Sequence, residues 1–499
     1  MTIKASIFIS LLLLFHPFFI SNAQQVWSPD NGDGTFTNPL MWGDWPDPDI
    51  IRVGDEFYMV STSMHYVPGS PIAKSKDLVN WEMAGYAVDR YDEEPGYDMK
   101  DGKTLYLNGS WANSIRYHNG KFYVAFCTPY GWGTEKGHFS VCEAEKVEGP
   151  WKRTVFPEYL YDPGLFFDDN GKVYVIHGQH DLFVTELNAD ARSVKGKPVK
   201  IWDKGVDDAH NSGKHAGMEG SHVYKINGPY EHKVVIQDDS SYPTNGLHQG
   251  GMVQLKNGDW WFIIMQDRGA IGRVPHLLPV KWIDGWPMLG INGHDVSIYQ
   301  KPNVGKTYPI KSPATTDEFN STKLGLQWQW NHNPDNSRWS LTERKGYMRL
   351  KASYAKELTT ARNTLTQRVQ GPLSTGTVEM DASGLKNGNV AGFGVFQDPY
   401  AYVAARQDNG IRKLIFCYKG KQTTIIENLK QDKIWFRARV TDKDFTSLDG
   451  KEFSPAGEVL HMDLGYPWTA NRFALLNYSE TQEGIGGIAD FNWFRFYNK

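Results

Sequence analysis

Cysteine is scarce in this chain of 499 residues, which argues against a fold held together by disulfides or zinc. The three cysteines are Cys127, Cys142 and Cys417, an odd number without the close spacing of a disulfide framework or a zinc site. Cys127 and Cys142 could pair if neighbouring strands brought them together. Both also lie in segments typical of strand cores, so we expect free, buried thiols.

An excess of charge of one sign is also lacking. The chain has 53 basic and 57 acidic residues, a formal net charge of −4, and no long basic or acidic run. We therefore expect neither nucleic acid nor an anionic membrane surface as a partner. Nothing in the sequence indicates an oligomeric state.

A long apolar run occurs only once, over residues 5–20, and Ser21-Asn22-Ala23 follows it with small residues suited to cleavage. This pattern predicts a secretory signal peptide over residues 1–23. The run is short for a membrane span, and no basic flank or cysteine follows that would indicate an anchor. We expect a secreted protein, periplasmic or extracellular, without a membrane span.

Aromatic residues and Asn-Gly turns are what the chain has in abundance. Phe, Trp and Tyr make up 14% of the residues. An Asp/Asn-Gly type turn followed by aromatic and β-branched residues predicts a β-hairpin. Such segments occur at residues 53–60, 118–124, 169–175 and 256–262, and in weaker form at 226–236.

A polar motif precedes each of these hairpins. The five motifs are Asp47-Pro48, Ser110-Trp111, Asp162-Pro163, Glu219-Gly220 and His248-Gln249. Five hairpins with a repeated motif favour a five-bladed β-propeller over residues 24–301, because a β-sandwich would not explain the repeated motif. Inner strands of a propeller converge on its axis, so we expect Asp47, Asp162 and Glu219 to meet at one mouth of the channel.

The pattern changes after residue 301. Residues 302–316 form a linker rich in Pro, Lys, Ser and Thr. Beyond it, residues 347–350, 377–381, 435–440 and 491–496 alternate apolar and polar positions with the period of half-buried antiparallel strands. We predict a β-sandwich over residues 317–499 that packs against the propeller, which makes the whole chain all-β.

The first polar motif organises the chemistry. Pro46 and Pro48 flank Asp47 and predict a stiff, extended backbone for it, next to the Trp45 ring. A fixed carboxylate beside an aromatic surface suits sugar chemistry. The alternative is a Pro-rich turn ahead of a strand. Asp49, two residues further along, is a rival for the same chemical role.

The motifs around Asp47, Asp162 and Glu219, in this order and with the five hairpins, resemble glycoside hydrolase family 43. Residues 111–117 and 248–251, ahead of Arg273, match further landmarks of this family of five-bladed propeller enzymes. Residues 326–334 and 363–368 resemble the C-terminal concanavalin-like sandwich of one branch of the family.

The resemblance implies an inverting glycosidase with three carboxylates. Asp47 would be the general base that activates water, and Glu219 the general acid that protonates the leaving oxygen. Inversion places two such carboxyls about 6.5–9.5 Å apart. Asp162 would orient Glu219 and raise its pKa, because a nearby like charge disfavours ionisation.

The resemblance also implies residues that contact the sugar. Arg273 would point into the sugar subsite, and Trp111 and Trp45 would stack on or wall the sugar, unless they serve only as blade core. His248 would lie on the propeller axis. No cofactor is required, although a calcium ion could sit near His248 and reach it through water. Asn113 and Gln249 depart from the commoner family pattern and bear on the details of the subsite.

The implied function is an exo-acting β-xylosidase or α-L-arabinofuranosidase that releases xylose or arabinose from hemicellulose-derived oligosaccharides or polysaccharides. The exo assignment depends on the sandwich, which in similar enzymes helps to close one end of the active site. Two alternatives stay open at this point: an endo-acting arabinanase and a carbohydrate-binding propeller without catalysis.

Overall fold

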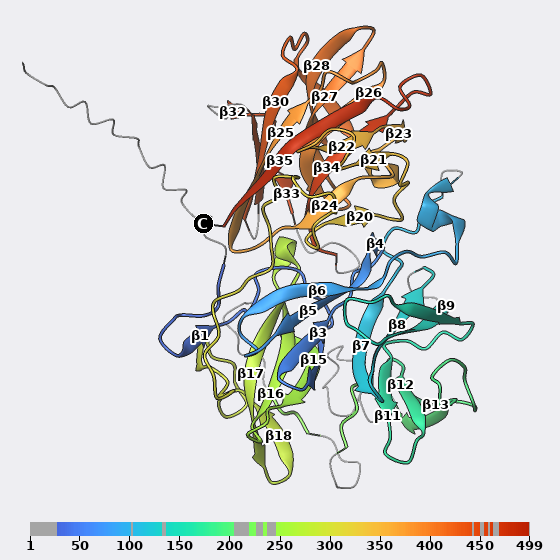
Figure 1. The fold of residues 1–499 in the computed structure, drawn as a ribbon, viewed down its shortest axis with the longest axis vertical. Helices are drawn as coiled ribbons and strands as arrows, with labels where there is room; N and C mark the ends of the chain where they lie inside the picture. The colour runs from blue at the N-terminus through green and yellow to red at the C-terminus, as the bar shows by residue number, and fades with distance from the viewer. Residues whose placement is uncertain are drawn as a thin grey trace, which may run out of the picture.

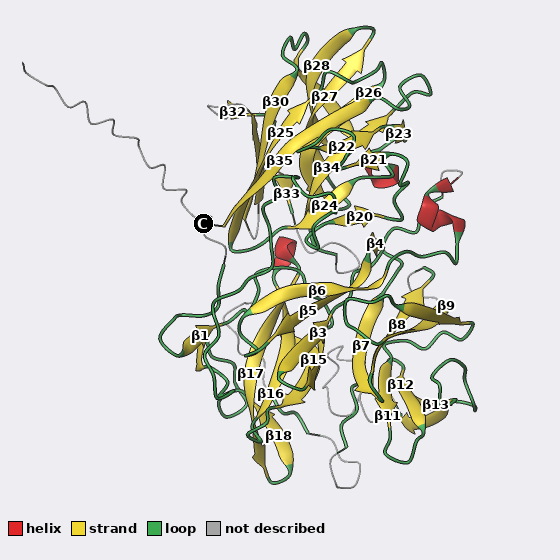
Figure 2. Cartoon of the chain, viewed as in Figure 1, coloured by secondary structure: helices red, strands yellow, loops and turns green. Residues whose placement is uncertain are grey.

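The computed structural model describes residues 27–100, 103–131, 136–203, 219–225, 233–236, 246–441, 444–449, 454–457, 460–462 and 469–498. Strands dominate this part of the chain, and its helical elements are short 3-10 turns (Figure 2): η1 (Pro95–Asp98), η3 (Gly269–Ile271) and η4 (Leu358–Thr360). The all-β prediction is confirmed. No helix among these residues is long and apolar enough to cross a membrane. The predicted signal peptide, residues 1–23, lies outside the described residues.

The N-terminal half forms a propeller of four-stranded antiparallel blades, coloured blue to yellow-green in Figure 1. Each blade is a meander in which consecutive strands pair, except that β4 interrupts the first blade. The described blades are β2 (Asp49–Val53), β3 (Glu56–Val60), β5 (Gly69–Ser75) and β6 (Trp81–Val88); β7 (Trp111–His118), β8 (Lys121–Pro129), β9 (Gly137–Ala144) and β10 (Lys152–Phe156); β11 (Gly164–Phe167), β12 (Val173–His177), β13 (Leu182–Leu187) and β14 (Val199–Trp202); β15 (Leu247–Gln254), β16 (Trp260–Asp267), β17 (Arg273–Ile283) and β18 (Trp286–Leu289).

Short glycine-containing turns join the inner two strands of the described blades where the sequence predicted them, Gly54-Asp55 in the first blade and Asn-Gly in the other three. In the β7–β8 turn, Asn119 and Gly120 have φ of +47° and +79°, the positive pair that a tight hairpin turn requires. The four strongest predicted hairpins are therefore confirmed as β2–β3, β7–β8, β11–β12 and β15–β16. The weaker fifth, at residues 226–236, lies largely outside the described residues.

The innermost strands stand side by side around the axis, with β2 next to both β7 and β15, and β7 next to β11. Residues 219–225 occupy the place between β11 and β15. A Cβ atom on Gly164 of β11 would lie 1.9 Å from the Ser221 carbonyl oxygen, and the Met252 N–H of β15 donates to the Tyr224 hydroxyl at 2.5 Å. In a five-bladed propeller, the innermost strand of the remaining blade would lie between β11 and β15, where residues 219–225 lie. The number of five blades stays a prediction.

The propeller ends at a pairing between its first strand and its last strand, both of them short. β1 (Thr35–Thr37) pairs antiparallel with β19 (Ile298–Gln300). Residues 302–316 then cross to the second domain without forming a strand. The three cysteines are free and buried, as expected.

The C-terminal half is a sandwich of two large, mostly antiparallel sheets, yellow to red in Figure 1 except for the blue β4. One sheet has the order β29 (Lys421–Ile426), β28 (Ile411–Tyr418), β27 (Ala401–Asp408), β26 (Asn389–Phe396), β34 (Arg472–Ser479), β24 (Leu365–Arg368), β20 (Gln329–Asn331) and β4 (Tyr66–Val67), with β23 (Ser353–Tyr354) beside β34. The other has β21 (Trp339–Ser340), β22 (Met348–Lys351), β35 (Ile488–Asn498), β25 (Leu373–Asp381), β30 (Lys433–Thr441), β31 (Asp444–Asp449) and β32 (Ser454–Pro455), with β33 (Leu460–His461) beside β31.

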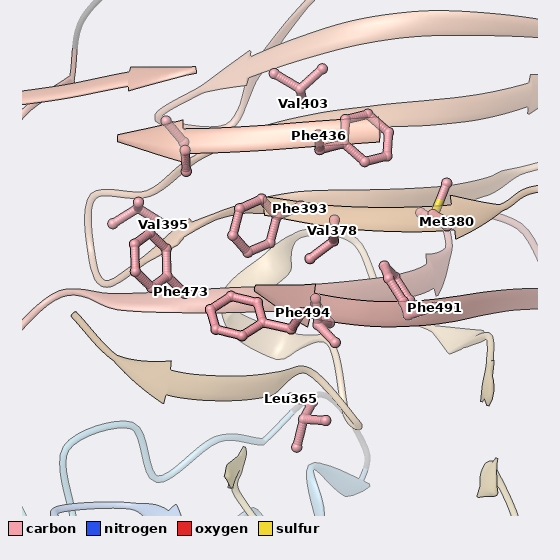
Figure 3. Packing of buried hydrophobic residues seen from close by; sticks show 14 of the residues in the cluster. Leu365, Val378, Met380, Phe393, Val395, Val403, Phe436, Phe473, Phe491 and Phe494 are labelled. Carbon is pink, nitrogen blue, oxygen red and sulfur yellow. The ribbon is translucent and has the colours of Figure 1, made fainter. Parts of the chain in front are cut away.

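Aromatic rings fill the space between these two sheets (Figure 3). Phe393 and Phe473 stack with ring centroids 5.7 Å apart, and Phe494 from the opposite sheet meets Phe393 edge-on at 6.0 Å. All three rings are at most 1% exposed. Burial of each ring contributes roughly 1.5–3 kcal/mol to the stability of the fold. The apolar positions of the alternating sequence pattern supply such buried side chains, so the pattern accounts for this core.

The two domains share a sheet. β4 comes from the first blade of the propeller, yet it pairs with β20 of the sandwich, with Trp330 opposite Val67. The Arg368 Nε of β24 also donates to the Asp44 carbonyl at 2.7 Å, and the Asn471 N–H donates to the Ala270 carbonyl at 3.1 Å. The sandwich is therefore fixed against the segments that lead into β2 and β17.

Candidate active site

Each innermost segment of the propeller has a residue of positive φ at or close to its start. These residues are Asp47 (+50°), Ala112 (+48°), Asp162 (+48°), Gly220 (+65°) and Gln249 (+49°). They fall at the five polar motifs that the sequence analysis identified. A left-handed residue turns the chain sharply, and non-glycine residues adopt this conformation only when surrounding contacts hold it. The repetition means that the same backbone device places the side chains at the mouth of the channel in every repeat.

The extended backbone predicted for Asp47 is wrong, because its φ is positive. Long-range contacts override the local preference of an X-Pro residue. The Asp47 N–H points at the Met265 Sδ at 3.0 Å, and the side chain is tied down at both oxygens. Aspartate also tolerates positive φ better than most residues.

The Asp47 carboxylate is buried and each of its oxygens accepts one hydrogen bond. Arg273 Nη1 donates to Oδ1 at 2.9 Å, and Thr62 Oγ1 donates to Oδ2 at 2.6 Å. Asp47 is 7% exposed. The group is thus held rigidly, and a lone pair on either oxygen is left to accept a further proton.

Arg273 links Asp47 to a second acid. Its Nε donates to Asp267 Oδ1 at 3.2 Å, and its backbone N–H donates to Asp44 Oδ1 at 3.0 Å. Burial opposes the charge on Arg273, but Asp47 and Asp267 outweigh burial and raise its pKa. The guanidinium therefore stays charged and buried among these acids.

Asp162 and Glu219 complete the group of acids. The Gly220 backbone N–H bonds the Asp162 carboxylate, and the Gln249 amide lies 3.5 Å from Asp162 Oδ2. Glu219 is more exposed, and its Oε2 accepts from Gln179 Nε2 at 2.8 Å and from the Tyr161 hydroxyl at 3.4 Å. The structure thus brings together the three carboxylates that lie far apart in the sequence.

Asp162 and Glu219 are both shifted toward the protonated form. Burial raises the pKa of Asp162 well above its usual value, and the charges of Glu219 and Asp47 raise it further. Burial also raises the pKa of Glu219, with Asp47 as the next cause, whereas Arg273 opposes the rise. The charge of Asp47 therefore contributes to the raised pKa of Glu219, and the role of Asp162 as the residue that raises it stays a prediction.

Asp49, the rival for the role of Asp47, lies deeper in the ring of inner strands and is 0% exposed. Its Oδ2 accepts from Arg116 Nη1 at 2.6 Å, from the Ile115 N–H at 2.8 Å and from Ser114 Oγ at 3.1 Å. Burial opposes the charge of Asp49, but Arg116 and His222 outweigh it and lower its pKa. This saturated carboxylate ties β2 to β7, so we assign it a structural role.

The two predicted tryptophans lie in different surroundings. Trp111 is 7% exposed and donates its Nε1–H to the Leu107 carbonyl at 2.8 Å, and its ring packs beside the partly buried Tyr161. Trp45 is 3% exposed, belongs to the core of the first blade, and carries the Arg368 guanidinium over its ring at 4.5 Å. These contacts favour the packing alternative for Trp45.

His248 lies at the rim of the group, its side chain 41% exposed and its Nε2 3.4 Å from Asp267 Oδ2. The buried histidine that reaches the centre of the ring is His222, with Nδ1 3.4 Å from Asp49 Oδ2. Among the described residues no group of three or more His, Cys, Asp or Glu could hold a metal ion. In the described part of the chain, the carboxylate beside His248 is Asp267, which also binds Arg273, and a calcium ion near His248 stays a prediction.

Thr62, Gln179 and Asp267 contact the acids but were missed by the sequence analysis. Thr62 lies just beyond β3, in the run Ser61-Thr62-Ser63. Three hydroxyl residues directly after an apolar strand were a signal that could have drawn attention to it. Gln179 and Asp267 carry no comparable local pattern, because only the closure of the propeller brings them to the site.

Comparison with known proteins adds independent findings. Residues 36–231 match the family described as Glycosyl hydrolases family 43, and residues 316–497 match the Beta xylosidase C-terminal Concanavalin A-like domain. The chain is 30% identical to a beta-xylosidase of Formosa agariphila over 96% of this chain and 93% of that protein. It is 33% identical to a non-reducing end alpha-L-arabinofuranosidase of Bacteroides ovatus over 64% of this chain and 65% of that protein.

A solved structure has the same two-domain fold. A bifunctional GH43-CE protein of Bacteroides eggerthii superposes with a TM-score of 0.83 at 36% identity, covering 93% of this chain and 64% of that one. The propeller and the sandwich therefore occur together in a known protein as they do here.

Proposed function

The chain belongs to glycoside hydrolase family 43, as its motifs predicted, and on this premise we propose that it removes single xylose or arabinose residues from hemicellulose-derived glycans with inversion. It is a glycoside hydrolase. The observation that carries the proposal is the group of three carboxylates around one buried guanidinium at the mouth of the propeller. The names of the relatives, a beta-xylosidase and an alpha-L-arabinofuranosidase, support a pentose as the sugar.

Asp47 acts as the general base. Arg273 and Thr62 each occupy one of its oxygens and hold the carboxylate in place, so an attacking water can give its proton to a remaining lone pair. A base held in one orientation avoids the loss of rate that a displacement of about 1 Å brings. The water then attacks the anomeric carbon from the face opposite the leaving oxygen.

Glu219 acts as the general acid. Gln179 and Tyr161 both donate to its Oε2, so the proton that it delivers sits on Oε1. Burial and the charge of Asp47 raise its pKa, which keeps this proton in place at higher pH than in a free glutamate. Asp162, whose pKa is also raised, accepts the Gly220 N–H and so fixes the segment that carries the acid.

The sandwich supports exo action. It contacts the segments before β2 and before β17, which carry Asp47 and Arg273. A second domain seated beside the mouth leaves less room for a long chain to pass through, so a terminal sugar is the favoured substrate. An endo-acting arabinanase would need an open cleft across the same mouth.

The test compares phenyl β-D-xyloside with phenyl α-L-arabinofuranoside, each hydrolysed by the wild type and by Glu219→Gln. Phenol is a poor leaving group that needs protonation, so loss of the acid should lower kcat by about 10²–10⁴-fold on both substrates. A 2,4-dinitrophenyl glycoside needs little protonation and should lose much less. Equal losses on the two aglycones would remove the acid role from Glu219, and no turnover of any of these substrates by folded protein would refute the proposed function.

A further inference from the structure

Thr62 is a candidate for a role beyond the three acids, because it is the closest partner of the Asp47 carboxylate. Its Oγ1 lies 2.6 Å from Asp47 Oδ2 and 2.7 Å from the Ala112 backbone nitrogen. Thr62 is 1% exposed, so water does not compete for the hydroxyl. The two short contacts come from different blades and meet on one oxygen atom.

The direction of these bonds is fixed by chemistry. A hydroxyl has one proton to donate and can accept others. The Ala112 N–H can only donate, so Thr62 Oγ1 accepts from it and keeps its own proton for Asp47. The carboxylate oxygen accepts that proton in a charge-assisted bond, which is shorter and stronger than a neutral one.

The backbone of β7 is built to present this donor. Trp111 pairs with Cys127 and Ser114 pairs with Ala125, so two residues of β7 face one residue of β8. Such a bulge frees backbone groups from the ladder and redirects them, and bulges are common beside active sites. Ala112, with φ +48°, lies in the bulge and turns its N–H away from β8 toward Thr62.

The backbone of Thr62 adds a second attachment to the same segment. The Thr62 N–H donates to the Pro46 carbonyl at 3.0 Å. The residue therefore holds both the chain before Asp47 and the side chain of Asp47. Arg273 holds the other carboxylate oxygen, so Thr62 and Arg273 together fix the rotation of the carboxylate, with Thr62 holding Oδ2.

From these contacts we propose that Thr62 is a positioning residue for the general base, relaying the orientation of the β7 bulge to Asp47 through its hydroxyl. The inference rests on the proposed function, because it assigns Asp47 the role of base. It extends the site to a residue that touches neither sugar nor leaving group. It also gives the bulge at Ala112 a purpose in catalysis.

The test measures kcat and KM for Thr62→Val, Thr62→Ser and Thr62→Ala on the substrate that the wild type hydrolyses. Loss of the hydroxyl in the valine variant should lower kcat by about 10–100-fold while KM changes less than about threefold, since the base is misplaced but the sugar contacts remain. The serine variant keeps the hydroxyl and should stay within about threefold of the wild-type kcat. Should the valine variant not fold, the alanine variant serves in its place.

Thr366→Val is the matched control. Thr366 is a fully buried threonine of the sandwich whose Oγ1 donates to the Gln329 carbonyl at 2.9 Å. This variant loses a buried hydroxyl of the same kind and should keep the wild-type kcat. A fall in kcat equal to that of Thr62→Val would show that any buried hydroxyl has this effect and would overturn the inference.

A double variant separates this inference from the proposed function. In an Asp47→Asn background, Thr62→Val should change the residual rate by less than about threefold, because the group that Thr62 positions is no longer a base. A wild-type rate in Asp47→Asn would refute the proposed function itself. Two outcomes would refute only the role of Thr62, each with Asp47→Asn inactive. In the first, Thr62→Val keeps the wild-type kcat; in the second, Thr62→Ser loses as much kcat as Thr62→Val.

Discussion

Removing one partner of the Asp49–Arg116 ion pair should destabilise the propeller without removing its chemistry. The pair closes at 2.6 Å, Asp49 is fully buried and the Arg116 side chain is 13% exposed. In Arg116→Leu the carboxylate of Asp49 keeps the Ile50 and Ile115 N–H groups, Ser114 and His222 as partners but loses its guanidinium. In Asp49→Asn the guanidinium of Arg116 is left without its acid.

The magnitude follows from the burial of the pair. Breaking a buried ion pair by removing one partner costs about 3–5 kcal/mol, because the other charge stays buried without compensation. For a domain of this size that corresponds to a fall in Tm on the order of 10 °C. In the double variant Asp49→Asn/Arg116→Leu no lone charge is left, so the loss should be clearly smaller than the sum of the two single losses.

The assay follows thermal unfolding of the three variants and measures kcat well below each Tm. We expect kcat of Asp49→Asn within about tenfold of the wild type, whereas Asp47→Asn should lose about 10²–10⁴-fold in kcat. Strictly additive losses of stability would contradict the account of the pair. A folded Asp49→Asn without activity would contradict the assignment of the base to Asp47.

Two further variants test the surroundings of the acids. In Gln179→Leu the ionised form of Glu219 loses a hydrogen bond that lowers its pKa, so the pKa of Glu219 should rise. Because a general acid acts while protonated, the basic limb of the pH profile of kcat/KM should move to higher pH. A basic limb at the wild-type pH would contradict the contact. In Gly272→Ala the new Cβ would lie 2.3 Å from Asp44 Oδ1 and 2.5 Å from the Ala470 Cβ, at a φ of +94°. We expect the unfolding free energy to fall by roughly 1–3 kcal/mol and kcat to fall because Arg273 is displaced. A variant with the wild-type Tm and kcat would show that the sandwich does not hold the segment around Gly272 in place.

Local features of the fold could be predicted from the sequence because they depend on a few neighbouring residues. The Asn119-Gly120 turn needs two positive φ values, and Asn-Gly supplies them at little cost. The alternation around Val378 and Phe494 likewise predicts strands with one buried face. The repeated polar motif indicated the propeller, and with it the meeting of Asp47, Asp162 and Glu219.

Features set by distant contacts could not be predicted in the same way. β4 is two residues long, and only its pairing with β20, far away in the sequence, makes it a strand. The positive φ of Asp47 contradicts the preference of a residue before proline, since Thr62, Met265 and Arg273 hold it. Local sequence carries no record of such partners.

The roles of the acids show the same limit. The sequence kept Asp49 as a rival to Asp47, which the family motif favoured as the base, and the structure separates them by burial and donor count, with Asp49 saturated inside the ring and Asp47 at its mouth. Trp45 has the sequence context of a sugar platform, yet Arg368 from the other domain covers its ring. A domain contact of this kind depends on how two separate folds dock.

The most direct test of the central claim is to identify the anomer of the sugar that the enzyme releases first. ¹H NMR detects this anomer during hydrolysis of phenyl β-D-xyloside or phenyl α-L-arabinofuranoside. Attack by a water that Asp47 activates inverts the anomeric carbon, so α-xylose or β-arabinofuranose should appear first and equilibrate later. First release of the anomer with the configuration of the substrate would mean a covalent intermediate, and it would contradict the role of Asp47 as base.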